Sequence, residues 1–156
     1  MILEEEGLEQ VWARHALFAR AIWTAVDHWG ASGAIGLNIA DPARRSHAVT
    51  TIRVRPGDGD RLRAWCAETA GLTLGIALCP PGEDPGSLFR IGHMGHLNPP
   101  MVLGTLATIE AGLAAVGIPH APGGASAAAR VVADFGAAPR AAEGAMNPVE
   151  HTAETT

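Results

Sequence analysis

The sequence contains no lysine and no tyrosine. All 11 basic residues among its 156 residues are arginines. Lysine is the residue that supplies an amine nucleophile or a Schiff base in covalent catalysis. The absence of lysine therefore excludes such catalysis by this chain alone.

Other absences narrow the class of protein further. The net charge of −5 comes with no basic stripe, so we predict no nucleic-acid partner. No apolar run approaches the roughly 20 residues of a membrane span, and the acidic start Glu4–Glu6 is unlike a signal peptide. We therefore predict no membrane association and a cytoplasmic location. The two cysteines, Cys66 and Cys79, form no CxxC pair and are predicted to be reduced.

Four helices are predicted from the spacing of apolar residues and from residues that start or stop helices. The first covers 1–30, interrupted by Gly7 and ended by Gly30, because apolar residues recur at every third or fourth position. The second covers 60–71, with Asp60 as its cap. The third covers 99–116, with Asn98 as its cap and Pro99 in its first turn. The fourth covers 125–135.

Strands are predicted over 47–55, 72–78 and 88–93, where strand-forming residues concentrate, and a short strand over 35–39 is compatible with the sequence. These elements predict an α+β fold: a two-layer sandwich with a small, mainly antiparallel sheet and helices packed on one face. The predicted domain covers 1–136. Residues 137–156 contain few large apolar groups and are predicted to form a disordered tail.

The most informative stretch reads Phe-Arg-Ile-Gly-His-Met-Gly-His, from Phe89 to His96. Strand alternation points Phe89 and Ile91 to one face and Arg90 to the other. An arginine near the end of a strand, beside a glycine turn and a helix start, is suited to binding a carboxylate. The alternative is that Arg90 pairs with a structural Asp or Glu. The pattern alone leaves both interpretations open.

The other candidate motifs give little information about function. His93 and His96 have an H-x-x-H spacing, but it crosses a glycine turn and no third ligand follows, so no metal site is predicted. The GxGxxG fingerprint, the P-loop and the G-x-S-x-G elbow are absent. His15 and Cys66 are interpreted as packing residues on helices. The residues themselves offer one anion-binding candidate and no catalytic set.

Several stretches together resemble one family. They are Ile2–His15, Ser46–Thr51, Gly71–Gly75, Phe89–Asn98 and Gly117–His120. The family is the class V (fold type I) pyridoxal-phosphate-dependent aminotransferases of the alanine–glyoxylate and serine–glyoxylate or serine–pyruvate group. The chain resembles their C-terminal small domain over roughly residues 2–135. One departure is the loop Cys79–Gly86, which is longer and richer in proline than is usual in the family.

The resemblance implies a role for Arg90 as the residue that holds the carboxylate of a small 2-amino or 2-oxo acid. It implies no catalytic residue, no cofactor-binding residue and no metal ligand in this chain. The Schiff-base lysine and the pyridoxal-phosphate site belong to the family's larger domain. The implied function is the small-domain part of a transaminase acting on an amino acid and an oxo acid such as glyoxylate or pyruvate, inactive alone.

Three hypotheses remain open at this level. The chain is part of a larger or split enzyme with a separately encoded large-domain chain, a non-catalytic module that binds a small carboxylate or a protein, or a truncated remnant. A partner, or self-association, predicts an exposed apolar face that contains Trp12, Trp23 or Trp29.

Overall fold

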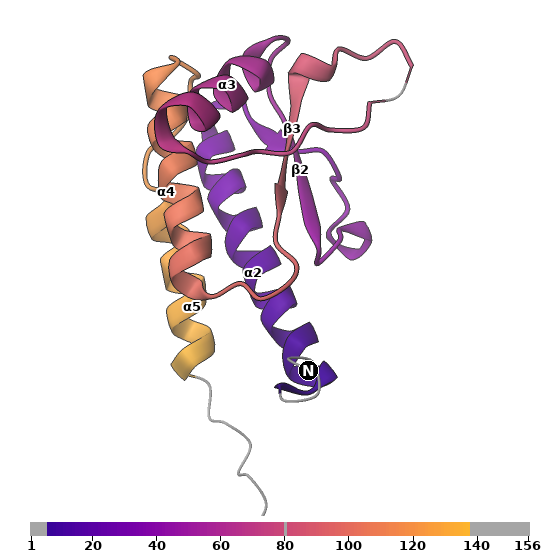
Figure 1. Ribbon diagram of the computed structural model, residues 1–156, viewed down its shortest axis with the longest axis vertical. Helices are drawn as coiled ribbons and strands as arrows, with labels where there is room; N and C mark the ends of the chain where they lie inside the picture. Colours follow the sequence, from indigo (N-terminus) through magenta and orange to yellow (C-terminus); the bar gives the residue numbers. More distant parts are fainter. Residues whose placement is uncertain (1–5, 80, 138–156) are drawn as a thin grey trace, which may run out of the picture.

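Three helices lie side by side against a small sheet in the computed structural model, which describes residues 6–79 and 81–137 (Figure 1). They are α2 (Leu8–Trp29), α4 (Pro99–Ala115) and α5 (Gly124–Ala137), and a fourth helix, α3 (Asp58–Ala70), packs against the C-terminal end of α4. The strands are β1 (Gly36–Leu37), β2 (Val49–Arg53) and β3 (Leu88–Gly92). The predicted α+β fold is confirmed. No helix in the described ranges is long and apolar enough to cross a membrane.

Helix α2 supplies much of the core. Residues 1–5 of the predicted helix over 1–30 lie outside the described residues. Helix α2 starts at Leu8, after Gly7, whose φ of +80° lies in the left-handed region that favours glycine. Its buried face includes Phe18, Ile22, Val26 and Trp29. Helices α4 and α5 pack beside it and close the core with Leu106, Ile109, Leu113 and Ala128.

The sheet is antiparallel with the order β1-β2-β3. Its register pairs Thr50 with Ile91, Thr51 with Arg90, and Ile52 with Phe89. Alternation places Thr50, Ile52, Phe89 and Ile91 on the face that is buried against the helices. Arg90 lies on the opposite, outer face, as the sequence predicts.

The predicted strand over 72–78 is wrong. Only Gly75 forms a bridge, to Arg90, and the rest of the segment makes no ladder with the described residues. Leu72 is still tied to the end of α3, where its amide donates to the carbonyl of Cys66, and the chain leaves β3 again after Gly75. Ile76 and Leu78 are consequently 62% and 88% exposed.

The boundaries of the other three helices lie within two residues of the predicted ones. Helix α3 begins at Asp58 after Gly57, so Asp60 is not its cap but lies in its first turn, paired with Arg63. Gly71 ends α3 with a left-handed backbone. Asn98 caps α4 as predicted: its side-chain oxygen accepts a hydrogen bond from the Met101 amide at 3.0 Å.

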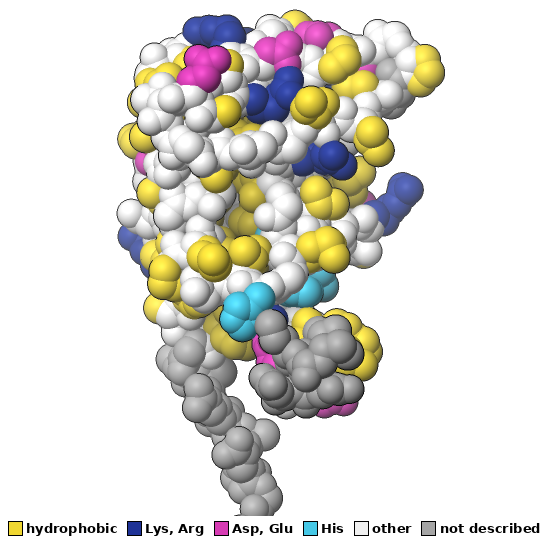
Figure 2. Space-filling model, in the orientation of Figure 1, with side chains coloured by type: hydrophobic (Ala, Val, Ile, Leu, Met, Phe, Trp, Pro, Cys, Tyr) yellow, Lys and Arg dark blue, Asp and Glu magenta, His cyan; other side chains and the backbone are white. Residues whose placement is uncertain are grey.

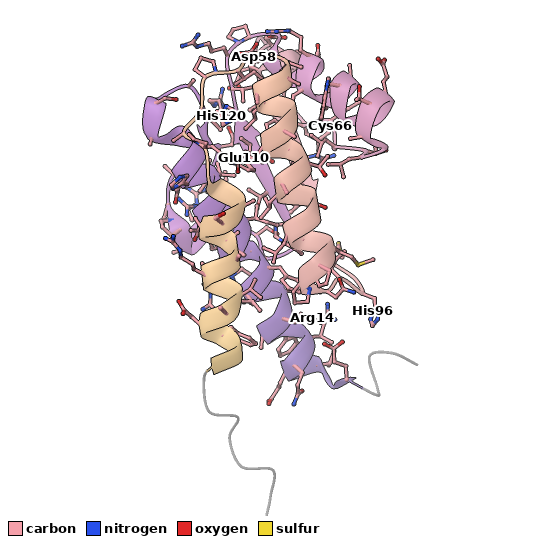
Figure 3. All side chains as sticks on the ribbon, turned by 90° about the vertical axis from the view of Figure 1, so that its left-hand side faces the viewer. Arg14, Asp58, Cys66, His96, Glu110 and His120 are labelled. Atoms are coloured by element: carbon pink, nitrogen blue, oxygen red, sulfur yellow. The ribbon has the colours of Figure 1, made fainter. Side chains whose placement is uncertain are left out.

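Helix α5 is capped by a residue of another helix. Gly123 precedes it and has no side chain, and the carboxylate of Glu110 in α4 accepts the amides of Gly123 and Ala125 (Figure 3). The same carboxylate accepts the indole N–H of Trp29 at 3.0 Å. Burial opposes ionisation of Glu110, but these donors outweigh it and hold its carboxyl pKa below the usual value. The predicted tail, 137–156, lies outside the described residues apart from Ala137.

Candidate functional site

Arg90 occupies the central position of the outer sheet face. It faces Thr51 of β2 on one side, and on the other side it exchanges two backbone hydrogen bonds of 2.9 Å with Gly75. The Arg90 amide and carbonyl both bond Gly75, and the register with β2 places Thr51 opposite Arg90 on the other side, which fixes where its side chain leaves the sheet. A residue in a rigid strand holds its side chain in a more precise position than a residue in a loop, which favours ligand binding.

The Arg90 side chain has no carboxylate partner among the residues that the structure describes. Its Nε is buried and makes no hydrogen bond there, and the ion pairs of the described residues use Arg14, Arg53, Arg61 and Arg63. A buried charged donor without a partner is costly, and a carboxylate is its best acceptor. This part of the structure therefore offers no structural ion pair for Arg90.

His93 and His96 do not form a metal site. The His93 ring is buried, with Nε2 2.9 Å from the Thr50 hydroxyl and Nδ1 3.1 Å from the His47 carbonyl. His96 is exposed on the other side of the turn. No group of three or more His, Cys, Asp or Glu side chains suited to a metal occurs among the described residues.

The hydrogen bonds define the protonation of His93. The Trp23 indole donates to the Thr50 hydroxyl at 3.0 Å, so that hydroxyl donates onward to His93 Nε2, and the Nδ1–H donates to the His47 carbonyl. Burial lowers the pKa of His93 to about 4, in keeping with this neutral tautomer. His93 is therefore a structural residue that ties the end of β3 to β2 and α2.

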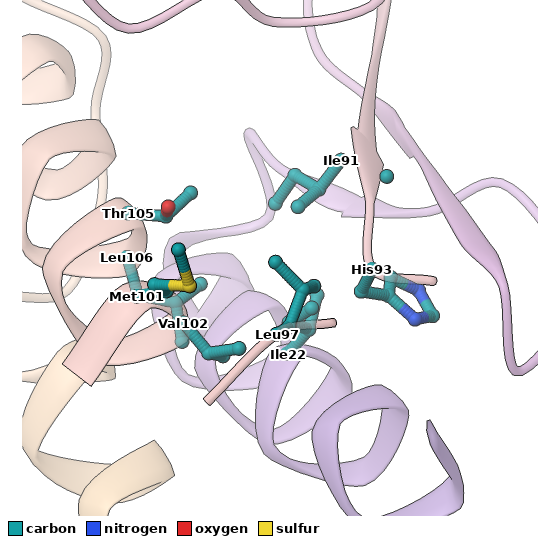
Figure 4. Close-up of a pocket in the computed structure, with 9 residues that line it drawn as sticks. Ile22, Ile91, His93, Leu97, Met101, Val102, Thr105 and Leu106 are labelled. Carbon is teal, nitrogen blue, oxygen red and sulfur yellow. The ribbon is translucent and has the colours of Figure 1, made fainter. Parts of the chain in front are cut away.

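A small cavity lies between the end of β3 and the start of α4 (Figure 4). It has a volume of about 40 Å³, and Ile91, Leu97, Met101 and Leu106 are among its lining residues. The His93 ring points away from it, toward the sheet. The cavity can hold a few water molecules but not an amino acid, so it is not a substrate pocket.

A more open groove of about 220 Å³ lies where α2 starts and the turn after β3 passes. Trp12 and Met94 line it and are 63% and 66% exposed. Histidine side chains gather on the same end of the molecule (Figure 2). Of the three tryptophans expected on an exposed face, Trp12 is exposed, Trp23 is half-buried, and Trp29 is fully buried because it packs under the start of α5.

Two contributors to the site were not predicted from the sequence. The sequence predicts a strand at Gly75 but not its position beside Arg90, and it gives no sign that the Arg14 guanidinium binds the turn after β3. Both lie in stretches that resemble the aminotransferase family. The resemblance to the family is the signal in the sequence that points to these two residues.

Comparison with known proteins places this arrangement in a family. No protein-family model matches the chain. It is 38% identical over 126 residues to the L-aspartate–glyoxylate aminotransferase of Paracoccus denitrificans, covering 80% of this chain and 30% of that protein. It is 37% identical over 131 residues to a serine–glyoxylate aminotransferase of Arabidopsis thaliana, again covering 30% of that protein.

The fold agrees with the sequence match. The crystal structure of ureidoglycine–glyoxylate aminotransferase from Bacillus subtilis superimposes with a TM-score of 0.72 and 27% identity, over 85% of this chain and 33% of that one. The fold and sequence together define a C-terminal, small-domain region of an aminotransferase. The chain belongs, over about four fifths of its length, to the class V pyridoxal-phosphate-dependent aminotransferases, and it spans about 30% of the length of the relatives it matches.

The residues of this chain do not fit pyridoxal phosphate by themselves. The sequence has no lysine to hold the cofactor covalently, and no Gly-rich phosphate-binding fingerprint. No chemical step of the cofactor is therefore assigned to this chain. What its residues offer is binding and orientation.

Proposed function

We propose that this chain acts as the small domain of a pyridoxal-phosphate-dependent transaminase, in which Arg90 binds the carboxylate of a small 2-amino or 2-oxo acid. The observation that carries the proposal is the Arg90 side chain, which stands on the outer sheet face with a buried Nε that no described residue accepts. A guanidinium pairs with a carboxylate through two parallel hydrogen bonds, and this fixes the plane of the ligand.

The lysine-bearing, cofactor-binding region is the proposed partner, as part of the same polypeptide or as a separate chain. The support is that the chain spans about 30% of its relatives' length and contains no lysine. The three relatives named above all have glyoxylate in their names, so an oxo acid of this size is the proposed acceptor. In the complex, Arg90 would hold the substrate while the partner supplies the cofactor.

A hybrid enzyme tests the proposal. The matching C-terminal third of the Paracoccus aminotransferase is replaced by this chain, either fused or added as a separate polypeptide, and amino transfer to glyoxylate is measured. The hybrid is expected to be active, and Arg90→Ala is expected to lower kcat/KM about a hundredfold, since a charged bidentate contact is lost. Cofactor uptake should not change.

Arg53→Ala is the matched control. Arg53 lies on the same outer face but is paired with Glu83 and with the Asn38 side chain, so its removal should change kcat/KM less than threefold. A folded, cofactor-loaded hybrid without transamination would overturn the proposal. If the chain alone then bound glyoxylate or acetate at Arg90, the carboxylate-binding module would be the correct function instead.

The groove of Trp12 and Met94 is the proposed contact for the partner region, because it exposes large apolar side chains at the end where α2 begins. Trp12→Ser is expected to weaken association of the two-piece hybrid at least tenfold without changing the circular dichroism of the chain. Unchanged association would exclude this face. Sedimentation of the chain alone, with and without the substitution, would show whether the face serves self-association.

A further inference from the structure

Arg14 of α2 holds the turn that joins β3 to α4. Its Nη1 donates to the carbonyl of Gly95 at 2.8 Å and to that of Leu97 at 3.2 Å. Its Nε and Nη2 donate to the two carboxylate oxygens of Glu6 at 2.6 and 2.7 Å. All three guanidinium nitrogens are therefore occupied, and the Arg14 side chain is only 19% exposed. Figure 3 shows Arg14 at the start of α4, close to His96.

The contact with Glu6 exists because the chain bends at Gly7. In a straight helix, residues eight apart are separated by about 12 Å along the axis, too far for an ion pair. The backbone at Gly7, with φ +80° and ψ 142°, brings the Glu6 carboxylate back onto Arg14 instead. The hydrogen bond from Arg14 lowers the pKa of the Glu6 carboxyl group, so the pair is ionised at neutral pH. Arg14 thus connects the segment before α2 to the turn.

The turn is continuous with the strand that carries Arg90. Beyond β3, the His93 amide donates to the Ala48 carbonyl at 2.9 Å, and the His93 ring is fixed by Thr50. The sheet therefore holds the first half of the turn. Arg14 holds the second half, together with the His15 ring, whose Nε2 lies 3.3 Å from the Gly95 carbonyl.

These bonds fix geometry more than they add stability. Gly95 is exposed, so water can solvate its carbonyl if Arg14 is removed, and no buried acceptor is left there. Met94 at the tip is exposed too, and of the turn only Leu97 packs against the core. The two Arg14 bonds to Gly95 and Leu97 therefore restrain the segment together with the His15 ring and the packing of Leu97.

We propose that Arg14 is a positioning residue for the Arg90 site: the Glu6–Arg14 clamp fixes the turn after β3 and sets it relative to the segment that enters α2. The inference rests on the proposed function, because it concerns how precisely Arg90 is placed for binding the substrate carboxylate. Arg14 itself touches no substrate in this proposal. It acts through the backbone carbonyls of Gly95 and Leu97.

The kinetic test uses the hybrid enzyme. Arg14→Ala is expected to raise KM for glyoxylate about tenfold with kcat changed less than threefold, because a displaced binding group weakens substrate binding. Arg14→Lys should recover part of the loss, since an ammonium can still donate to one carbonyl. Arg61→Ala is the matched control: Arg61 also bonds one carboxylate, Asp58, and one carbonyl, Val116, but it lies at α3, so KM should not change.

A second measurement uses the chain without any partner. The ¹⁵N relaxation of the Arg90 Nε–H group reports its order directly. The order parameter is expected to fall in Arg14→Ala and to stay at its wild-type value in Arg61→Ala, even where the two variants lose similar thermal stability. An unchanged Arg90 order parameter in Arg14→Ala would overturn the positioning role.

The two proposals fail in different ways. If Arg90→Ala raises KM and Arg14→Ala does not, the clamp is overturned and the function stands. If Arg90→Ala leaves the kinetics of the active hybrid unchanged, the carboxylate role is overturned, and the role of Arg14 in the reaction is overturned with it.

Discussion

Gly75 and Arg90 lie directly against one another. Their backbones are joined by two hydrogen bonds of 2.9 Å, and the arginine side chain passes over the glycine. A Cβ atom on Gly75 would lie 3.2 Å from the Arg90 Cβ and 3.5 Å from its Nε. The missing side chain leaves the space that the guanidinium group uses.

Gly75→Val is expected to displace Arg90 and to lower kcat/KM of the hybrid enzyme at least tenfold, because the branched side chain needs the same space. The measurement is the steady-state rate with glyoxylate. The matched control is Gly36→Val in β1, where an added Cβ would meet no atom within 4 Å. Equal activity of the two variants would show that Arg90 does not depend on the space above Gly75.

The folded chain should lose stability in mild acid through His93. Its pKa is about 4 when folded, whereas an unfolded histidine binds its proton near pH 6.5, so the unfolded state holds more protons between these values. Stability is therefore greatest above about pH 6.5 and falls as the pH drops, by up to about 3 kcal/mol near pH 4. Urea unfolding at a series of pH values measures the slope.

His93→Gln should remove most of that slope, at the cost of lower stability at pH 7. His28→Gln is the control, because His28 is exposed and its Nε2 lies 2.9 Å from the Pro122 carbonyl. A slope between pH 6.5 and 4 that persists in His93→Gln would assign the acid sensitivity to other groups.

Thr50→Val should destabilise the chain by about 2 kcal/mol, since it removes the partner of both the Trp23 indole and His93 Nε2 while keeping the shape of the side chain. Thr50→Ser keeps the hydroxyl and should lose less than half as much. Urea unfolding at pH 7 compares the two. A loss within about 0.5 kcal/mol in Thr50→Val would show that the hydroxyl does not stabilise the chain.

Glu110→Ala should destabilise the chain by about 2–3 kcal/mol, because the amides at the start of α5 and the Trp29 indole lose their acceptor. Glu68→Ala on the exposed face of α3 is the control and should stay within about 0.5 kcal/mol. Since the Glu110 pKa is lowered, its contribution is present above the ordinary carboxyl pKa and is lost as the pH falls through the folded value. Glu110→Gln should flatten this acid limb below about pH 4.5.

The elements that the sequence predicts correctly are those with a local cause. The apolar spacing of α2 and α4 and the Asn98 cap depend on neighbouring residues. The outward direction of Arg90 follows from strand alternation alone. These features needed no knowledge of the tertiary structure.

The features that the sequence does not predict are long-range. Residues 72–78 have the composition of a strand, but only Gly75 reaches β3, and the composition does not reveal how many ladder bonds form. Glu110 and Arg14 look like ordinary helix residues. Glu110 accepts the amides of Gly123 and Ala125, 13 and 15 residues further along the chain. Arg14 donates to the carbonyls of Gly95 and Leu97, 81 and 83 residues further along.

The cap that Glu110 provides makes α5 dependent on α4 for its own formation. A helix of 14 residues with no acceptor at its first turn is marginal in isolation. We therefore expect α5 to form after α2 and α4 have docked, and its amides to exchange with solvent through a local opening that leaves the sheet intact. The order of assembly of the last helix is thus determined by one side chain from the helix before it.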